Sequence, residues 1–302
     1  MEAPKPVAPV DTRQRWRLVY ARSAAAPHLA PRDQQAGWEA GLIASGLPVV
    51  GLELEPPRPR IAFAAPLGVG LVAERELADL FLSERRPVAD VRLALTEHLP
   101  EGYELVDLHD VWLGEPALPG QVVAADYRAA VRVTRAVTES AVADVTAVAD
   151  VNAVADVTAV ADVTAVAMMT NAARQLLEES TLPRTRDKGG RAVAYDLRPL
   201  LADIVVDGVA GPASDPLAGP DGPDGPVASE QDLIEIRIRV RYDPERGVGR
   251  PEEVVAALAE LARLELSLES LVRERVLLAA DEVAVPLPWT ESLSSDSTPG
   301  DD

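Results

Sequence analysis

The sequence predicts an α+β protein of two tandem ferredoxin-like units, each with the element order β-α-β-β-α-β and an antiparallel sheet. Two observations predict this fold. Segments in which apolar and polar residues alternate are interspersed with segments whose apolar residues recur at helical spacing, and this order occurs once in each half of the chain. The length of 302 residues suffices for two ordinary domains. Because 47% of residues are hydrophobic but only 4% are aromatic, the cores must consist mainly of Leu, Val, Ala and Ile.

The first unit is expected over residues 13–120. It opens with a strand over 15–22, in which aromatic residues and leucine alternate with other side chains. Asp33 can cap the helix that follows, because its side-chain oxygen can accept a hydrogen bond from a free backbone N–H. The remaining elements are, in order, short strands over 49–54, 60–64 and 76–82, a helix from Pro87, and a strand over 103–113.

The second unit is expected over residues 121–288 and repeats the same order. Its clearest strand covers 233–242, where Ile and Val alternate with Glu and Arg. Its other elements are a strand over 126–134, a helical stretch ending near Glu179, strand segments within 182–206, a helix from Pro251, and a last strand over 273–286.

Two segments interrupt the second unit. Residues 141–164 form four copies of a hexapeptide, AVADVT or AVADVN. Valine at every third position gives no fixed apolar stripe on a helix of 3.6 residues per turn, so we interpret the block as a tandem duplication that lengthens a helix and projects from the domain. A functional interaction arm is the alternative. Residues 208–231 are rich in Gly and Pro and are expected to be a flexible loop.

The two ends of the chain are expected to be disordered, over residues 1–12 and over the acidic, Ser-rich residues 289–302. The net charge is −20, but acidic and basic residues nearly balance between residues 12 and 135, so the excess acidity lies in the C-terminal part. This acidity argues against DNA binding by the whole surface.

Composition also limits the cofactors and the location. There is no cysteine, which excludes a thiolate-ligated zinc ion or iron–sulfur cluster on these residues. The three histidines have no metal-ligand spacing, so no metal site is expected. Neither a secretory signal nor a membrane-spanning run is recognised, which predicts a cytoplasmic protein without membrane contact.

One acidic group is a candidate for catalysis. Glu74, Glu76 and Asp79 lie at the start of a predicted strand, where Glu74 and Glu76 would point to the same face. A pair of carboxylates at that spacing can serve as general acid and base. The alternative interpretation, which we favour, is that they are solvated charges at a sheet edge.

Basic residues form the second candidate site. Several cations surround Gly189-Gly190 in a predicted hairpin, and others flank Pro59 or follow the strand over 233–242. Such a cluster can bind a phosphate or a carboxylate, or can simply balance neighbouring acids. The candidate binding residues are Arg184, Arg186, Lys188, Arg191, Arg198, Arg58 and Arg60, and the strand adds Arg237, Arg239 and Arg241.

Several short motifs resemble one uncharacterised bacterial family, whose members are described as radical SAM-linked or radical SAM-associated proteins. The family positions include Asp33, Trp38, Glu76, Asp79 and Asp196. The family has Ser-His-Leu-Asp before its first helix, whereas this chain has Ala30-Pro31-Arg32-Asp33, so His28 is not in the family position. The matching motifs are Gly46-Leu47-Pro48, Pro57-Arg58-Pro59-Arg60-Ile61, Pro66-Leu67-Gly68-Val69-Gly70, Leu99-Pro100-Glu101-Gly102, Ala125-Asp126-Tyr127-Arg128, Lys188-Gly189 with Tyr195-Asp196-Leu197-Arg198-Pro199, and Gly249-Arg250-Pro251.

The resemblance implies a non-catalytic accessory or substrate-presenting partner of a radical SAM protein encoded nearby, in the modification of RNA or of a translation component. SAM and the iron–sulfur cluster are then expected only on the partner, with no cofactor on this chain. The alternative is a free-standing RNA-binding or RNA-modifying enzyme that uses a groove between the two units. That enzyme would require a catalytic carboxylate, for which Asp33, Glu76 and Asp196 are the candidates.

Overall fold

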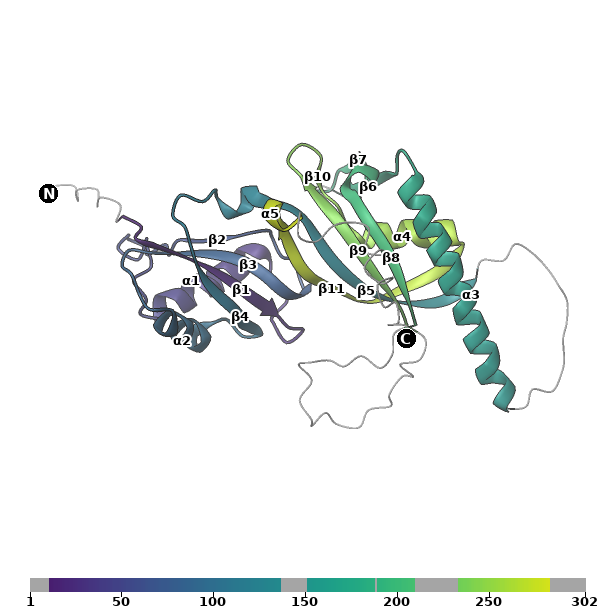
Figure 1. The fold of residues 1–302 in the computed structure, drawn as a ribbon, viewed down its shortest axis with the longest axis horizontal. Helices are drawn as coiled ribbons and strands as arrows, with labels where there is room; N and C mark the ends of the chain where they lie inside the picture. Colours follow the sequence, from purple (N-terminus) through teal and green to yellow (C-terminus); the bar gives the residue numbers. More distant parts are fainter. Residues whose placement is uncertain (1–10, 137–150, 188, 210–232, 283–302) are drawn as a thin grey trace, which may run out of the picture. The chain divides into compact units, whose positions relative to one another are not determined.

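The computed structural model describes residues 11–136, 151–187, 189–209 and 233–282, and it contains two compact units (Figure 1). The first unit comprises residues up to 123 together with 272–279, and the second comprises 124–271 and the residues from 280 onward. Both are mixed α/β structures, and the strand pairings are mostly antiparallel. Outside the described residues lie the hexapeptide copies before residue 151, Lys188, most of the Gly- and Pro-rich segment, and nearly all of both expected disordered ends.

In the first unit, four strands pair in the order β4-β1-β3-β2, and each pairing is antiparallel. The end of a late strand, β11, adds to this sheet by pairing in parallel with the start of β3, at Val72 and Ala73. The two helices lie together on one face of the sheet (Figure 1). The elements are β1 (Gln14–Arg22), α1 (Pro31–Ala44), β2 (Ile61–Phe63), β3 (Val72–Leu82), α2 (Val88–His98), β4 (Tyr103–Val111) and the 3₁₀ helix η1 (Leu118–Gln121).

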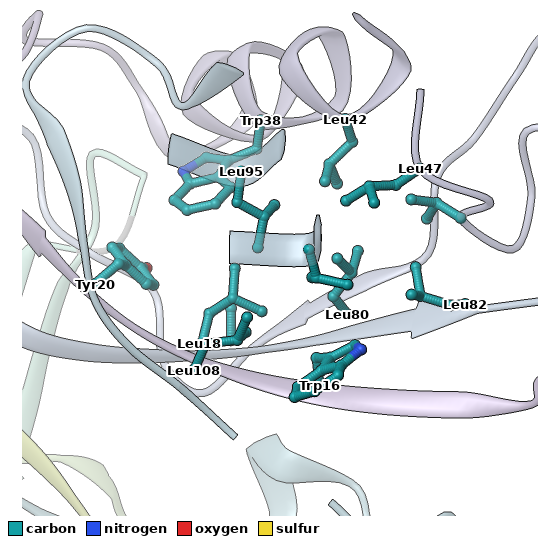
Figure 2. Close-up of a cluster of buried hydrophobic side chains, with 13 residues drawn as sticks. Trp16, Leu18, Tyr20, Trp38, Leu42, Leu47, Leu80, Leu82, Leu95 and Leu108 are labelled. Atoms are coloured by element: carbon teal, nitrogen blue, oxygen red, sulfur yellow. The ribbon is translucent and has the colours of Figure 1, made fainter. Parts of the chain in front are cut away.

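The core of the first unit lies between this sheet and the two helices (Figure 2). Alternate residues of a strand face the same side, so one face of β1 and one face of β3 supply it. Burying one large apolar side chain contributes about 1.5–3 kcal/mol relative to leaving it exposed. The principal contributors are Trp16, Leu18, Tyr20, Ala78, Leu80 and Leu82 from the strands, and Trp38, Leu42, Val91 and Leu95 from the helices.

The opposite face of β1 carries buried charges. The Asp79 carboxylate is fully buried and accepts hydrogen bonds from Arg15 Nε and Arg17 Nε, each at 2.9 Å. Arg15 also donates to the backbone carbonyls of Glu115 (2.7 Å) and Pro116 (2.9 Å). The pair of arginines therefore neutralises Asp79 and fixes the chain that follows β4.

In the second unit, β9 lies between β8 and β5, and β5 is followed by β11. The helix α3 contacts β8 and α4, while β6 and β7 form a separate hairpin. The elements are β5 (Val122–Ala136), α3 (Val151–Glu178), β6 (Pro183–Asp187), β7 (Ala192–Asp196), the 3₁₀ helix η2 (Arg198–Leu200), β8 (Leu201–Val209), β9 (Leu233–Asp243), β10 (Gly247–Val248), α4 (Pro251–Ala262), β11 (Leu264–Leu278) and α5 (Ala279–Glu282).

The alternation predicted for β9 is found in its buried residues, with one addition. Arg239 is also buried, and it holds Asp126 of β5 by two hydrogen bonds of 2.6 and 2.9 Å. Arg237 pairs with Asp207 of β8 at 2.6 Å. Neighbouring strands therefore supply carboxylates to two arginines of the predicted basic stripe.

The predicted strand over 49–54 is wrong. Those residues form a turn, and only Val49 makes an isolated bridge, to Leu82. Gly51 has a φ of +96°, a backbone conformation that residues with a side chain rarely adopt. A Cβ at this position would lie 2.0 Å from the Arg58 carbonyl oxygen. Pro56 and Pro57 then lack the N–H groups that a strand needs.

Several predicted element starts also differ from the structure, among them β5, which begins at Val122 rather than at 126. β3 begins at Val72 and β11 at Leu264, both earlier than predicted. The first helix begins at Pro31, whose fixed φ suits the first helical position, so Asp33 lies in the first turn and makes no side-chain cap. None of the helices in the described segments is long and apolar enough to cross a membrane.

We expect Asp79→Ala to destabilise the protein by about 3–5 kcal/mol, because it removes the buried carboxylate that Arg15 and Arg17 share and leaves Arg17 only the partly exposed Glu115. Glu84→Ala is the control, because Glu84 pairs with Arg86 at 3.0 Å on the surface just after β3 and such pairs contribute little. Urea denaturation of both variants measures the difference. Similar losses in the two variants would contradict the assignment of Asp79 as a structural centre.

Candidate functional site

The first unit contains a cavity of about 410 Å³, which we call the aromatic pocket. Its size is within the range typical of small-ligand sites. Residues from α1, β1, β2, β4 and the segment after β2 contribute to its walls. The lining residues are Tyr20, Pro31, Gln34, Gln35, Trp38, Ile61, Phe63, Ala64, Ala65, Pro66, Leu67, Tyr103 and Pro119.

Four aromatic rings meet in this pocket. The Trp38 ring lies edge-to-face against Tyr20, Phe63 and Tyr103, with centroid distances of 4.9, 5.5 and 5.4 Å. The interplanar angles are 63°, 73° and 80°. The whole chain has only 4 Trp, 5 Tyr and 2 Phe, so this one pocket holds more than a third of its aromatic residues. Aromatic residues bring large contact areas together with hydrogen-bonding groups, as in many binding sites.

Local sequence explains the position of the two central rings. Tyr20 follows Leu18 on the helix-facing side of β1, and Trp38 precedes Leu42 by one helical turn on the buried side of α1. Figure 2 shows Tyr20 and Trp38 together at one end of the buried cluster. Gly41 lets α1 approach α2 closely, since a Cβ there would lie 2.1 Å from the His98 carbonyl oxygen. The pocket is therefore a continuation of the core.

Residues 64–71, of which the first four line the pocket, are held by two buried arginines. Arg22 donates to the carbonyl oxygens of Gly68 (2.9 Å) and Leu71 (3.2 Å). Arg273 donates to the carbonyl oxygen of Pro66 at 3.2 Å. Their side chains are almost completely buried, so water does not compete strongly for these bonds. We call residues 64–71 the pocket loop.

Arg273 also forms a bidentate ion pair with Glu76. Its Nε and Nη2 atoms each lie 2.6 Å from a Glu76 carboxylate oxygen, and Glu76 is fully buried. Burial raises the pKa of Glu76, and the Arg273 guanidinium opposes that rise. Glu76 lies directly opposite Tyr20 in the pairing of β1 with β3. The buried layer next to the pocket thus contains two guanidinium groups, Arg22 and Arg273, and one carboxylate.

The two pocket tyrosines are held in the neutral form. Burial raises the pKa of Tyr20 well above its ordinary value, and the Glu76 carboxylate raises it further. Burial also raises the pKa of Tyr103, while the Arg22 guanidinium lowers it. Neither hydroxyl can therefore act as a base near neutral pH. None of the described residues that line the pocket is an Asp, Glu, His, Lys or Arg, so this arrangement favours binding rather than acid–base chemistry.

The candidate carboxylates do not form the expected pair. A β-bulge between Tyr20 and Arg22 places Ala73 opposite Arg22. Because the bulge changes the alternation of β3, Glu74 is exposed whereas Glu76 is fully buried. The prediction that Glu74 and Glu76 share a face is wrong for this reason. The interpretation of the group as solvated charges at a sheet edge is also wrong for Glu76 and Asp79, which are fully buried and paired with arginines. Asp33 is exposed on α1.

Asp196 and Arg198 have contacts that stabilise the backbone. Asp196 Oδ1 accepts hydrogen bonds from the N–H groups of Leu182 (2.7 Å) and Arg198 (3.0 Å). The Arg198 guanidinium donates to the carbonyl oxygens of Leu177, Glu179 and Leu201, at 2.6, 3.0 and 3.0 Å. Arg198 thereby joins the C-terminal end of α3 to β8.

The other basic candidates have separate surroundings. Arg184 pairs with Glu260 of α4 at 2.9 Å. The Arg186 guanidinium lies over the Tyr195 ring, 5.4 Å from its centroid, and Arg191 is exposed after the hairpin turn. In the first unit, Arg60 lies over Phe81 at 4.0 Å and Arg58 is exposed.

Trp38 is one of the positions of the motif resemblance, but its grouping with Phe63 and Tyr103 was not predicted from the sequence. The low number of aromatic residues could have indicated the group, because Phe63 is one of only two phenylalanines in the chain. Nothing in the local pattern around Arg273 indicates its pairing with Glu76. Within the described segments, no group of three or more His, Asp or Glu residues is placed to hold a metal ion.

Comparison with known proteins identifies a family. A family model described as "uncharacterized protein conserved in bacteria (DUF2344)" matches residues 15–215, two thirds of the chain. The match includes all four rings of the aromatic pocket and Glu76, whereas Arg273 lies beyond it. No curated protein matches the chain.

We expect the double variant Glu76→Gln/Arg273→Met to speed hydrogen exchange in the pocket loop, because the contact to Pro66 is lost while no charge is left buried alone. Arg273→Met by itself should also lower stability by about 3–5 kcal/mol, since it leaves Glu76 unpaired. Exchange of peptides covering residues 64–71 is the measurement, and Arg275→Met on the same strand is the control. Unchanged exchange in the double variant would show that Arg273 does not hold the loop.

Stability should fall as the pH rises above about 10, the pKa of an unfolded tyrosine. Folded Tyr20 keeps its proton there because its pKa is raised, so unfolding releases that proton and high pH favours the unfolded chain. Tyr20→Phe removes this contribution and should lose less stability than the parent between about pH 8 and pH 10.5. Urea midpoints at the two pH values are the measurement, and equal losses in both proteins would contradict the assignment.

Proposed function

The chain belongs to the DUF2344 family of uncharacterised bacterial proteins, and we propose that it is a non-catalytic accessory protein, which binds a substrate in the aromatic pocket and presents it to a radical SAM enzyme. One observation carries this proposal. The pocket combines the partly exposed rings of Phe63 and Tyr103, which pack on the buried Trp38 and Tyr20, with a lining of neutral residues, so it supplies contact area without an acid–base pair.

The radical SAM partner is supported by the motif resemblance and by composition. A radical SAM enzyme needs cysteines to hold its iron–sulfur cluster, and these 302 residues contain none. The cluster and SAM would therefore be supplied by the partner, a protein encoded nearby. RNA or a translation component is the proposed substrate of the pair.

Several residues of the motif resemblance gather at the aromatic pocket. Trp38 is one of its walls, and Pro66 and Leu67 lie in the pocket loop. Glu76 binds Arg273, which in turn holds the Pro66 carbonyl. Positions that are far apart in the sequence thus contribute to one pocket, which supports a shared binding role for them.

The finer description of the fold is also a proposal. The strand orders β4-β1-β3-β2 and β11-β5-β9-β8 both suit a ferredoxin-like unit, and the helices follow in the matching places. We propose that the hexapeptide block is an insertion that lengthens α3, the helix in which residues 151–164 lie.

Blocking the pocket should abolish the modification but not the complex. Gln35 is an exposed residue of α1 that lines the pocket, so Gln35→Trp places a bulky ring at its mouth. Ala36, the next residue, is exposed but does not line the pocket, so Ala36→Trp is the matched control. Both variants should co-purify with the co-expressed radical SAM protein.

The readout is the set of modified nucleosides and peptides, measured by mass spectrometry in a deletion strain that carries each variant. We expect Ala36→Trp to restore the parent profile and Gln35→Trp to match the deletion. A profile that does not change when the protein is deleted, or that Gln35→Trp restores in full, would contradict the proposal.

A further inference from the structure

We infer that the aromatic pocket takes a neutral, planar heteroaromatic ring, the chemical class of the nucleobases, and that it excludes quaternary ammonium groups. The reason for binding the ring, which is to present it to an enzyme, rests on the proposed function. The binding itself is argued from the pocket residues.

The arrangement of the rings favours a flat group. The Trp38 plane is steeply inclined to the planes of Phe63 and Tyr103, by 73° and 80°. Trp38 itself is buried, whereas Phe63 and Tyr103 are partly exposed. A flat ring can therefore meet the exposed part of either ring by its face or by its edge, which are the two favourable geometries for aromatic pairs. Ala64 and Ala65 line the same cavity with small side chains and leave space for such a ring.

A cluster of aromatic rings can also form a cage for a quaternary ammonium group, which is the rival ligand class. The charges beside the pocket oppose it. Arg22 and Arg273 carry two positive charges in the buried layer, and Glu76 carries one negative charge. Charges in a poorly hydrated interior interact more strongly than in water, so a further cation would be repelled there.

One contact and the composition of the lining also disfavour a cation. The Arg22 guanidinium lies 6.0 Å from the centroid of Tyr103, so one cation already uses the electron-rich face of that ring. None of the described residues in the lining carries a carboxylate that could attract another cation. The carboxylate of Glu39 is nearby, but it accepts a hydrogen bond from Gln35 at the exposed mouth of the pocket (2.9 Å).

Polar groups in the lining favour a ring with nitrogen and oxygen atoms over a hydrocarbon. Tyr20 and Tyr103 bring neutral hydroxyls, and Gln34 and Gln35 bring amides. Gln34 is already engaged, since it donates to the Leu29 carbonyl (2.8 Å) and accepts a long hydrogen bond from Tyr103 (3.4 Å). Gln35 is exposed, so a ligand can replace its hydrogen bond to Glu39 at little cost, and a glutamine amide offers the donor and acceptor that pair with the edge of a base.

The test is calorimetric titration of the full chain with adenosine, guanosine, cytidine, uridine and tetramethylammonium. We expect at least one nucleoside to bind with a Kd of about 1 mM or lower, and tetramethylammonium to bind at least about tenfold more weakly. Gln35→Trp should weaken nucleoside binding about tenfold or more, whereas Ala36→Trp should leave it within about twofold. Equal melting temperatures of the two variants confirm that both are folded.

A short single-stranded oligoribonucleotide separates two sources of the ring. Binding that is tighter than for the nucleoside and weakens with added salt identifies a base within an RNA chain, because phosphate contacts are salt-dependent. Affinity equal to that of the nucleoside identifies a free base or nucleoside. Either result supports a heteroaromatic ligand.

Three results would overturn the inference: tetramethylammonium binding more tightly than every nucleoside, no nucleoside binding at millimolar concentration, or Gln35→Trp and Ala36→Trp having the same affinity as the parent. These results are independent of the proposed function. A nucleoside can bind as expected while the profile of modifications in cells stays unchanged, which would contradict the accessory role alone.

Discussion

The ion pair between Glu76 and Arg273 is the contact on which the aromatic pocket depends. It joins β3 to a residue near the end of the last strand, and both side chains are almost completely buried. Neither charge can be kept in the interior without the other, because an isolated buried charge is strongly destabilising. The same guanidinium holds the Pro66 carbonyl, and the carboxylate lies opposite Tyr20. The pair therefore positions one aromatic wall and, together with Arg22, the pocket loop.

The pocket in the first unit depends on residues that come late in the sequence. Residues 272–279 belong to the first unit, although they follow nearly all of the second unit in sequence. A truncation after residue 215, where the family match ends, would remove Arg273 and leave Glu76 buried without its partner. The pocket is thus a property of the complete chain, although its rings all come from the N-terminal part. Its neutral lining and the excess of positive charge behind it are what favour a neutral planar ligand over a cation.

The sequence predicts those parts of the structure that depend on neighbouring residues. Alternation located β1 and β9, and helical spacing with a leading proline located α4. The turn over 49–54 was missed because its apolar residues resemble a strand, while Gly51 and two prolines decide the backbone. The Glu76–Arg273 pair was not predictable, since nothing local specifies a partner 197 residues away. Trp38 was marked by resemblance, but the meeting of its ring with Phe63 and Tyr103 is a tertiary contact.

Ring binding in the aromatic pocket can be observed in a crystal structure of the full chain soaked with the tightest-binding nucleoside. We expect density for a planar ring in the aromatic pocket, in contact with Phe63 or Tyr103, with the pocket loop still bound to Arg273 through the Pro66 carbonyl. Density for the ring at another place, such as the basic β6–β7 hairpin, with the aromatic pocket empty, would contradict ring binding in this pocket.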